Sequence, residues 1–302
     1  YYAYTAQLMA KISEALKTDD CDAYAAKAKA YRNLAQEIKE EFQTRYVDAD
    51  GDLKQKSQTA YLLALKQDLF PTEEARKKGL ETLTRKIAGN GNRLSTGFVG
   101  TAILNQTLSQ FGESDTAYNL LLQRGNPSWL YSIDQGATTI WERWDSYTKE
   151  KGFGPVSMNS FNHYSYGAVS EWMYRTMGGI DIDETRPGFK HIVLQPVPDN
   201  RTEIPAGQER INWVNASFPS CYGDIKSSWK KENDGAVSYQ ISIPANTTAT
   251  LHLQLPTLDY VVEESGKAAV KAEGVSSITF MNGKAVLELQ SGSYQFVVKK
   301  GK

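Results

Sequence analysis

The sequence predicts two parts of different fold class, a helical domain over residues 1–180 and an antiparallel β-sandwich over residues 181–302. Two observations carry this prediction. Apolar residues recur at helical spacing up to about Gly178, whereas apolar and polar residues alternate beyond Gly179. Short loops between the helices favour antiparallel helix pairs, and short alternating strands favour a sandwich. We expect the boundary within residues 178–190.

Each expected helix is supported by a stripe of apolar residues and by start or stop signals. The carboxylates of Glu73 and Glu74, for example, follow Pro71 in the first turn of a helix, where the helix dipole favours negative charge. The expected helices span residues 1–17, 22–46, 55–69, 71–88, 99–111, 115–123 and 161–177. The expected strands span residues 191–194, 238–243, 249–255, 277–280, 285–289 and 293–298. Turn signals at residues 233–235, 282–283 and 291–292 separate several of these strands.

Composition and charge exclude several classes of function. The formal net charge of −1 offers no basic excess for nucleic acid or an anionic membrane surface, and no apolar run approaches the roughly 18 residues of a membrane span. Cys21 and Cys221 are expected to be unpaired thiols, and the three histidines are scattered. We therefore expect no metal and no cofactor.

The chain begins without an initiator Met, so we expect it to be a piece of a longer protein.

An acidic loop at residues 48–52 resembles a calcium-binding loop only faintly. It contains Asp48, Asp50 and Asp52, but Gly51 falls at the wrong offset and Thr59 stands where the pattern needs Glu. A polar turn between two helices is the better interpretation.

Residues 126–177 mix aromatic, hydroxyl, amide and carboxylate side chains in a way that suits a sugar site. Glycoside hydrolysis needs an acid and a second carboxylate, and Glu142 lies between Trp141 and Trp144. The alternatives are an ion pair of Glu142 with Arg143, or a place on a solvated helix face. Asp134 and Asp145 are weaker candidates, because each also suits a helix cap or a turn. His163 suits either packing or the binding of hydroxyl groups.

Several blocks of the sequence, in consistent order, resemble those of bacterial α-L-rhamnosidases, glycoside hydrolase family 78. The blocks are residues 91–100, 127–131, 136–146, 158–169, 187–192 and 243–250. The resemblance implies an (α/α)₆ toroid, incomplete in this chain, followed by a β-sandwich. It also implies an enzyme that releases terminal α-L-rhamnose from oligosaccharides or glycosides with inversion.

The resemblance also implies the roles of individual residues. The Glu of the Trp-Glu-Arg-Trp block is the catalytic base, which is Glu142 here, and His163 contacts the sugar hydroxyls. The further residues expected to bind substrate are Trp129, Trp141, Trp144 and Asn162.

Two departures from the family pattern bear on these expectations. The family's general acid belongs to a motif of the form Asp-x-x-x-Arg-x-Glu-x-x-Gly-Trp, which does not occur in these 302 residues. We therefore expect the acid and further helices upstream of Tyr1, and little activity from this piece alone. Arg93 stands where many relatives carry His, which puts one contact in doubt.

Two other classes remain open from the sequence. One is a carbohydrate-binding or sensing relative that has lost catalysis, which the presence or absence of the upstream motif would distinguish. The other is a toroid lyase or uronyl hydrolase, which needs basic residues at the site, where this stretch offers only Arg143. A homodimer and a periplasmic or extracellular location are further expectations.

Overall fold

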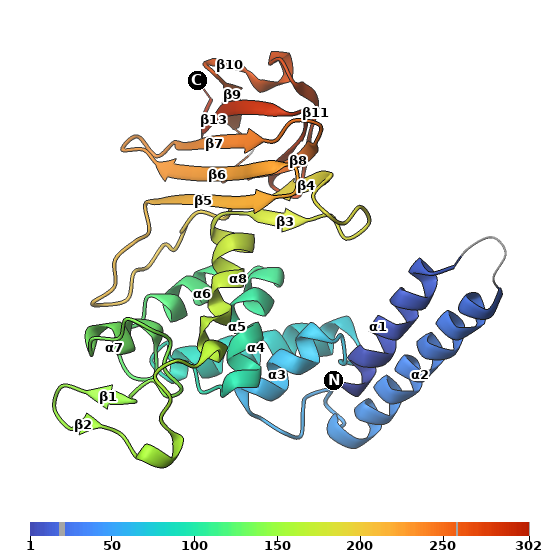
Figure 1. Ribbon diagram of the computed structural model, residues 1–302, viewed down its shortest axis with the longest axis vertical. Helices are drawn as coiled ribbons and strands as arrows, with labels where there is room; N and C mark the ends of the chain where they lie inside the picture. The colour runs from blue at the N-terminus through green and yellow to red at the C-terminus, as the bar shows by residue number, and fades with distance from the viewer. Residues whose placement is uncertain (18–21, 258, 302) are drawn as a thin grey trace. The chain divides into compact units, whose positions relative to one another are not determined.

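The computed structural model describes residues 1–17, 22–257 and 259–301 (Figure 1). By their contacts, the residues divide into two compact units, which are described separately. The first unit contains Tyr1–Thr107 and Gly125–Ser165, and the second contains Leu108–Arg124 and Tyr166–Lys302. The predicted domains, residues 1–180 and 181–302, remain a prediction about how the protein is organised.

Helices form most of the first unit. They are α1 (Tyr2–Ala15), α2 (Asp22–Tyr46), α3 (Gln58–Lys66), α4 (Glu73–Gly89), the first turns of α5 (Phe98–Gln110) and the short α7 (Trp129–Asp134). Helix α4 begins as predicted, because the Thr72 hydroxyl accepts a hydrogen bond from the Ala75 amide (3.1 Å) with Glu73 and Glu74 in the first turn. Helices α1 and α2 lie side by side and meet through small residues, with Ala6 and Ala28 buried (Figure 1).

The acidic loop at residues 48–52 is a turn in which the carboxylates of Asp48 and Asp52 bind groups of the protein. Oδ1 of Asp48 accepts hydrogen bonds from the amides of Asp50 and Asp52, both at 3.0 Å. The Asp52 carboxylate in turn binds Lys56 and the Tyr61 hydroxyl. Among residues 1–17, 22–257 and 259–301, no group of three His, Cys, Asp or Glu side chains is arranged to hold a metal ion. These contacts agree with a polar turn.

The predicted helix at residues 161–177 forms only in part. The structure has a 3-10 turn at Tyr164–Ala168, the short helix α8 (Val169–Trp172) and a π-turn at Met173–Met177. Residues 161–163 are not helical, because the His163 amide donates to the carbonyl of Ile140 (2.8 Å) and not to a carbonyl of its own helix. In the second unit, α6 (Ser114–Leu121) forms where a helix was expected.

Two sheets form the β-sandwich of the second unit. One has the order β10-β9-β13-β7-β6-β5, and the other has the order β11-β12-β8-β4-β3. Their bounds are β3 (Ile180–Ile182), β4 (His191–Leu194), β5 (Trp213–Ser220), β6 (Gly223–Lys231), β7 (Val237–Ile243), β8 (Thr248–Gln254), β9 (Tyr260–Glu264), β10 (Lys267–Ala268), β11 (Val275–Met281), β12 (Lys284–Leu289) and β13 (Gly292–Lys300). The pairing is antiparallel as predicted except between β4 and β8, which run parallel.

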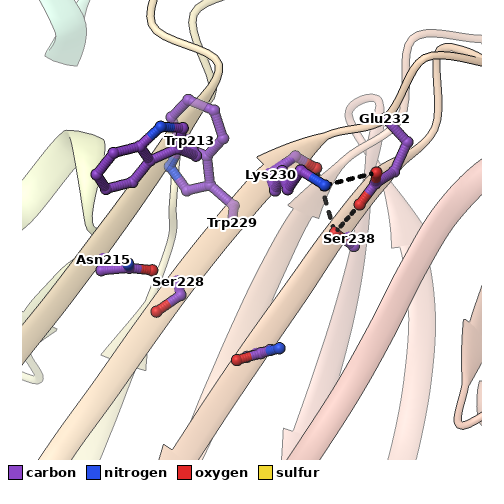
Figure 2. Close-up of a pocket in the computed structure, with 8 residues that line it drawn as sticks. Trp213, Asn215, Ser228, Trp229, Lys230, Glu232 and Ser238 are labelled. Carbon is purple, nitrogen blue, oxygen red and sulfur yellow. Dashed lines mark hydrogen bonds and ion pairs between the residues drawn. The ribbon is translucent and has the colours of Figure 1, made fainter.

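The core of the sandwich takes alternate side chains from both sheets. Trp229 and Phe296 of the first sheet and Leu251 and Leu287 of the second are all buried in it. On β6 the neighbours of Trp229 face outward, so Ser228 and Lys230 lie on the outer surface (Figure 2). The six strands expected from the sequence are present as β4, β7, β8, β11, β12 and β13.

Glycine is required where the chain enters the sandwich. Gly179 has a φ of +73°, and a Cβ on it would lie 2.0 Å from the backbone nitrogen of Pro196. Only glycine combines this left-handed backbone with such a close approach. The Gly178-Gly179 pair therefore lies where two backbone segments approach closely, as well as where the periodicity of the sequence changes.

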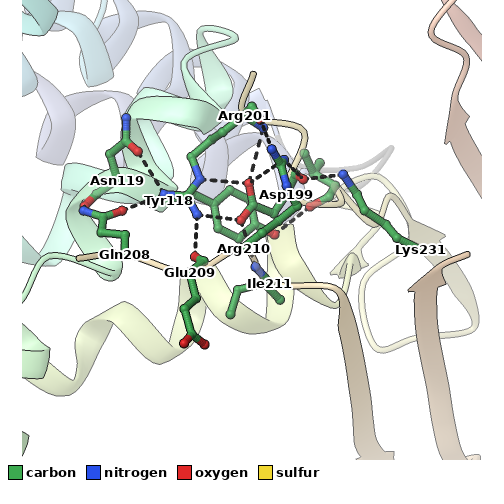
Figure 3. A network of polar contacts seen from close by, with 10 residues as sticks. Tyr118, Asn119, Asp199, Arg201, Gln208, Glu209, Arg210, Ile211 and Lys231 are labelled. Atoms are coloured by element: carbon green, nitrogen blue, oxygen red, sulfur yellow. Dashed lines mark hydrogen bonds and ion pairs between the residues drawn. The ribbon is translucent and has the colours of Figure 1, made fainter. Parts of the chain in front are cut away.

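A buried ion pair connects α6 with the loop that precedes β5 (Figure 3). Arg201 and Asp199 are 1% and 0% exposed, and the guanidinium binds both carboxylate oxygens at 2.8 and 2.9 Å. Nη1 of Arg201 also donates to the side chains of Asn119 (2.9 Å) on α6 and Gln208 (2.6 Å). The remaining Nη2 hydrogen reaches the carbonyl of Glu209 at 2.9 Å. The guanidinium is thus fully hydrogen-bonded in the interior.

Candidate active site

Two segments of the first unit pair through their backbones and bring the predicted residues together. The Glu142 amide donates to the carbonyl of Ser160 (2.9 Å), and the His163 amide donates to that of Ile140 (2.8 Å). The two segments run antiparallel past each other, although neither is a regular strand. The pairing places the predicted base and the predicted hydroxyl-binding histidine on neighbouring stretches of chain.

A backbone amide holds the carboxylate of Glu142. The Ser160 N–H donates to Oε2 at 2.8 Å, and in the described part of the chain no donor reaches Oε1. Glu142 is half-buried and lies outside any helix, which excludes a solvated helix face. Arg143 pairs with Asp145 (Nε to Oδ1, 3.6 Å), both partly exposed. The geometry therefore favours a positioned carboxylate over a local ion pair.

The three tryptophans of this segment are packed rings. Trp141 lies edge-on to Phe161, with centroids 5.4 Å apart, and Trp129 lies edge-on to Trp144 at the same distance. All three indoles are at most 9% exposed in the described chain. The Trp144 carbonyl also accepts a hydrogen bond from Ser132 on α7 (2.7 Å). The rings anchor the loop that carries Glu142, and their contact with a sugar remains a prediction.

His163 is held by two aromatic rings and one backbone amide. Its ring stacks on Phe98, with centroids 4.6 Å apart and planes 19° from parallel, and on Tyr164, with centroids 5.7 Å apart and planes 2° from parallel. The Ser165 N–H donates to Nδ1 at 3.4 Å. A neutral imidazole that accepts at Nδ1 carries its proton on Nε2. Asn162 next to it is exposed, and its backbone amide donates to the Ser160 hydroxyl at 3.2 Å.

Ser146 closes the loop beyond Glu142. Its carbonyl accepts hydrogen bonds from Gly154 (2.8 Å) and from the Asn159 side chain (2.9 Å), and its hydroxyl accepts the Arg143 amide at 3.2 Å. The hairpin of β1 (Tyr147–Thr148) and β2 (Gly152–Phe153) lies between these partners. Ser146 and Ser160 therefore fix the two ends of the site loop. Sequence reasoning missed both, because only their position in recognisable blocks distinguishes them from other serines.

The remaining sequence candidates are placed nearby or have structural roles. Asp134 ends α7 and does not begin a helix. Arg93 lies against Gly125, where a Cβ would be 2.5 Å from Nη2, so its side chain borders the start of the 126–146 segment. Cys221 is an exposed free thiol, and Cys21 lies outside the described residues.

None of the described helices has both the length and the apolar character to cross a bilayer.

Family models match the chain over most of its length. A model described as the bacterial alpha-L-rhamnosidase 6 hairpin glycosidase domain matches residues 1–177. A second, described as the bacterial alpha-L-rhamnosidase C-terminal domain, matches residues 179–268.

Individual relatives agree with these models. An α-L-rhamnosidase of Streptomyces avermitilis is 38% identical over 99% of this chain and 26% of its own length. One of Formosa agariphila is 36% identical over 99% of this chain and 30% of its own length. The crystal structure of the S. avermitilis α-L-rhamnosidase complexed with L-rhamnose superposes with a TM-score of 0.83 at 37% identity, covering 98% of this chain and 26% of that one. The structure of an α-L-rhamnosidase from Dictyoglumus thermophilum gives 0.84 at 28% identity, covering 99% of this chain and 31% of that one. The chain thus spans less than a third of the length of these relatives.

Proposed function

The chain belongs to the bacterial α-L-rhamnosidase family, and we propose that the protein containing it hydrolyses terminal α-L-rhamnosyl groups with inversion. The substrates are rhamnose-terminated glycosides or oligosaccharides. The observation that carries the proposal is the fixed carboxylate of Glu142, with Oε2 bound by the Ser160 amide and Oε1 left to act.

Glu142 acts as the general base in this proposal. Oε1 takes a proton from a water molecule as the oxygen of that water attacks the anomeric carbon, and the bond to the leaving oxygen breaks on the opposite face. The hydrogen bond to Oε2 restricts the rotation of the carboxylate, so less orientational freedom is lost when the water binds. Inversion requires an acid roughly 6.5–9.5 Å from the base. We propose that a segment outside these 302 residues supplies it, since the family's acid motif does not occur in them.

His163 positions the sugar in the same proposal. With Nδ1 accepting from Ser165, Nε2–H is the donor that faces a hydroxyl oxygen of the rhamnosyl group. The stack on Phe98 keeps the imidazole plane fixed while it donates.

The assignment of the base is tested with Glu142→Gln in the full-length protein. Glutamine preserves the shape of the side chain and cannot take the proton, so kcat should fall by about 10²–10⁴-fold. Glu150→Gln is the matched control, because Glu150 is an exposed carboxylate in the neighbouring β-hairpin turn. Both variants should melt at the temperature of the wild type. An aryl α-L-rhamnoside serves as substrate, and nearly unchanged turnover by Glu142→Gln contradicts the assignment.

Product stereochemistry separates a base from a nucleophile. Proton NMR of early time points should show β-L-rhamnose as the first product of the wild type, whereas α-L-rhamnose would contradict inversion. In Glu142→Ala, added azide attacks without losing a proton, so it should restore turnover and give the β-L-rhamnosyl azide. A wild-type protein that binds L-rhamnose but turns over no rhamnoside would indicate the sensing relative instead.

A further inference from the structure

The outer face of the six-stranded sheet carries an open depression that the proposed reaction does not use (Figure 2). Its volume is about 370 Å³, within the range of roughly 300–1,000 Å³ that is typical of small-ligand sites. It lies over β5, β6 and β7 in the second unit. The outward-facing residues that line it include Trp213, Asn215, Ser228, Lys230, Ser238 and Gln240.

Strand register arranges these side chains in two rows across the three strands. The first row is Trp213, Lys230 and Ser238, and the second is Asn215, Ser228 and Gln240. The rows are two residues apart, about 7 Å along the strands, and neighbouring strands are about 4.8 Å apart. An indole at one corner thus lies beside a grid of hydroxyl and amide groups.

Trp213 is unusually exposed for its type. The indole is 62% exposed at the start of β5, which is an edge strand. Trp229 on the next strand shows the contrast, because it is 2% exposed and donates its indole N–H to the Met177 carbonyl (2.7 Å). A large apolar ring left in water beside polar groups is typical of a binding surface.

The polar groups of the second row are available for a ligand. In the described chain, the side chains of Asn215, Ser228 and Gln240 make no hydrogen bond to protein. An amide offers both donors and acceptors, and a hydroxyl offers one of each, which matches the hydroxyl groups of a sugar. The face of a pyranose ring is apolar and fits flat against an indole.

The charges at the depression balance one another. Lys230 pairs with Glu232 (Nζ to Oε2, 3.2 Å), and the Ser238 hydroxyl donates to Oε1 of Glu232 at 2.7 Å. Hydrogen bonds from Ser238 and Lys230 lower the pKa of Glu232, which keeps it ionised beside the lysine. No net charge is therefore left to attract an anionic ligand, and a neutral one is favoured.

We propose that this face is a second carbohydrate-binding site, which holds a neutral glycan chain. Trp213 stacks on one pyranose ring, and Asn215, Ser228 and Gln240 bind the hydroxyls of the chain as it crosses the strands. The site goes beyond the proposed hydrolysis, since its occupant needs no terminal rhamnose. Its effect is to hold the protein on the polymer from which substrates are cut.

The binding test uses native gels that contain a polysaccharide without rhamnose. Such a polymer cannot occupy a rhamnose-specific active site, so retarded migration of the full-length protein that depends on Trp213 reports the second site. The probes are galactan, galactomannan and xyloglucan, with polygalacturonate as the acidic comparison. At least one neutral polymer should retard the wild type. Trp213→Ala should weaken that binding about tenfold or more, and Trp213→Phe should retain part of it.

Control variants distinguish the contribution of the Trp213 indole to polysaccharide binding from general effects of substitution. Phe280→Ala removes another exposed ring, 61% exposed on β11 of the opposite sheet, and should bind like the wild type. Gln240→Ala tests the second row and should also weaken binding. Each variant should hydrolyse an aryl α-L-rhamnoside at the wild-type rate, which keeps failure of this site distinct from failure of the proposed activity. Equal retardation of Trp213→Ala and wild type, or no retardation by any neutral polymer, overturns the proposal.

Oxidative footprinting with mass spectrometry tests whether another protein surface occupies the face. In the full-length protein alone Trp213 should oxidise readily, and the retarding polysaccharide should protect it. A Trp213 that is already protected without polysaccharide indicates a contact between protein surfaces and overturns the proposal. Retardation by polygalacturonate alone means that no neutral polymer binds, and it also overturns the proposal.

Discussion

At the scale of single residues, His163 combines a fixed ring with one remaining polar atom. The stack on Phe98 sets the ring plane, and the Ser165 amide occupies Nδ1. What the imidazole contributes beyond packing is therefore a single donor, Nε2–H. Because packing uses the ring and substrate binding uses only Nε2–H, a substitution that keeps a ring can measure the contribution of the donor.

His163→Phe in the full-length protein keeps a ring for the stack and removes the donor. A lost hydrogen bond to substrate that leaves a partner unpaired costs about 1–3 kcal/mol, so kcat/KM for an aryl α-L-rhamnoside should fall by about 5- to 150-fold. The melting temperature should be unchanged. Tyr164→Phe is the control, because it keeps the ring that stacks on His163 and removes only the hydroxyl of an exposed side chain. If kcat/KM of His163→Phe equals that of the wild type, the histidine has only a packing role.

The sequence singled out candidate residues, but it carried no sign of how their side chains are held. Glu142 and His163 lie in distinctive blocks, and both are found on paired segments. The partner of the carboxylate is a backbone amide 18 residues away, and residue types carry no signal for such a contact. The tryptophans were expected to bind substrate, which stays a prediction, and the structure adds that Trp129 packs on Trp144 and Trp141 on Phe161.

At the scale of elements, the alternation of residue types located some strands closely and missed others. Strand β7, Val237–Ile243, was predicted almost to its ends, because buried Tyr239, Ile241 and Ile243 alternate with polar residues. Strand β6 was missed, since buried Ser227 interrupts its apolar face. Strand β5 was missed as well, with Pro219 near its end, a residue that an edge strand tolerates.

The Asp199–Arg201 pair holds α6 and the loop before β5 in place, so its loss should destabilise the second unit. Arg201→Met leaves a buried carboxylate without its main partner, which costs about 3–5 kcal/mol. Urea unfolding at pH 7, followed by circular dichroism, measures the change. Arg186→Ala is the control, because Arg186 pairs with Asp183 at the surface (2.8 Å) and such pairs contribute about 0–1 kcal/mol. A change below about 1 kcal/mol for Arg201→Met contradicts the structural role.

The same pair predicts the pH dependence of this difference. Burial raises the pKa of Asp199, but hydrogen bonds from Arg201 and from the Ile211 amide outweigh it and hold that pKa below the usual value. An acid with a lowered pKa stabilises the fold above its unfolded pKa of about 3.9 and loses this contribution as pH falls. The unfolded chains titrate alike in the two proteins, so the difference between their free energies of unfolding should narrow on acidification as Asp199 becomes protonated, first in Arg201→Met, where the buried carboxylate lacks its main partner. Asp115, whose pKa is raised by burial and by Asp199, is present in both proteins and leaves the sign unchanged.

At the scale of the whole molecule, the change of period near Gly178 was enough to predict a helical part followed by a sandwich. Helix α1 exposes part of its apolar surface in this chain. Its small residues Ala6 and Ala10 are buried, whereas Leu8 and Ile12 are 41% and 42% exposed. A helix that exposes its larger apolar side chains has a face suited to a further helical layer. This agrees with relatives that are more than three times as long as the chain.

We therefore expect the 302-residue chain by itself to show little or no turnover of an alkyl α-L-rhamnoside. An alkoxide leaves only when an acid protonates it, and in our proposal that acid is outside the chain. The measurement compares release of L-rhamnose by the chain and by the full-length protein at equal concentration. Far-UV circular dichroism of the chain should show helix and strand together, so that inactivity is not mistaken for unfolding.

α-L-Rhamnosyl fluoride, whose leaving group needs little protonation, should be hydrolysed faster than the alkyl glycoside if Glu142 is correctly placed. Turnover of the alkyl glycoside by the isolated chain at the full-length rate would locate the acid within these residues and overturn its assignment to another segment.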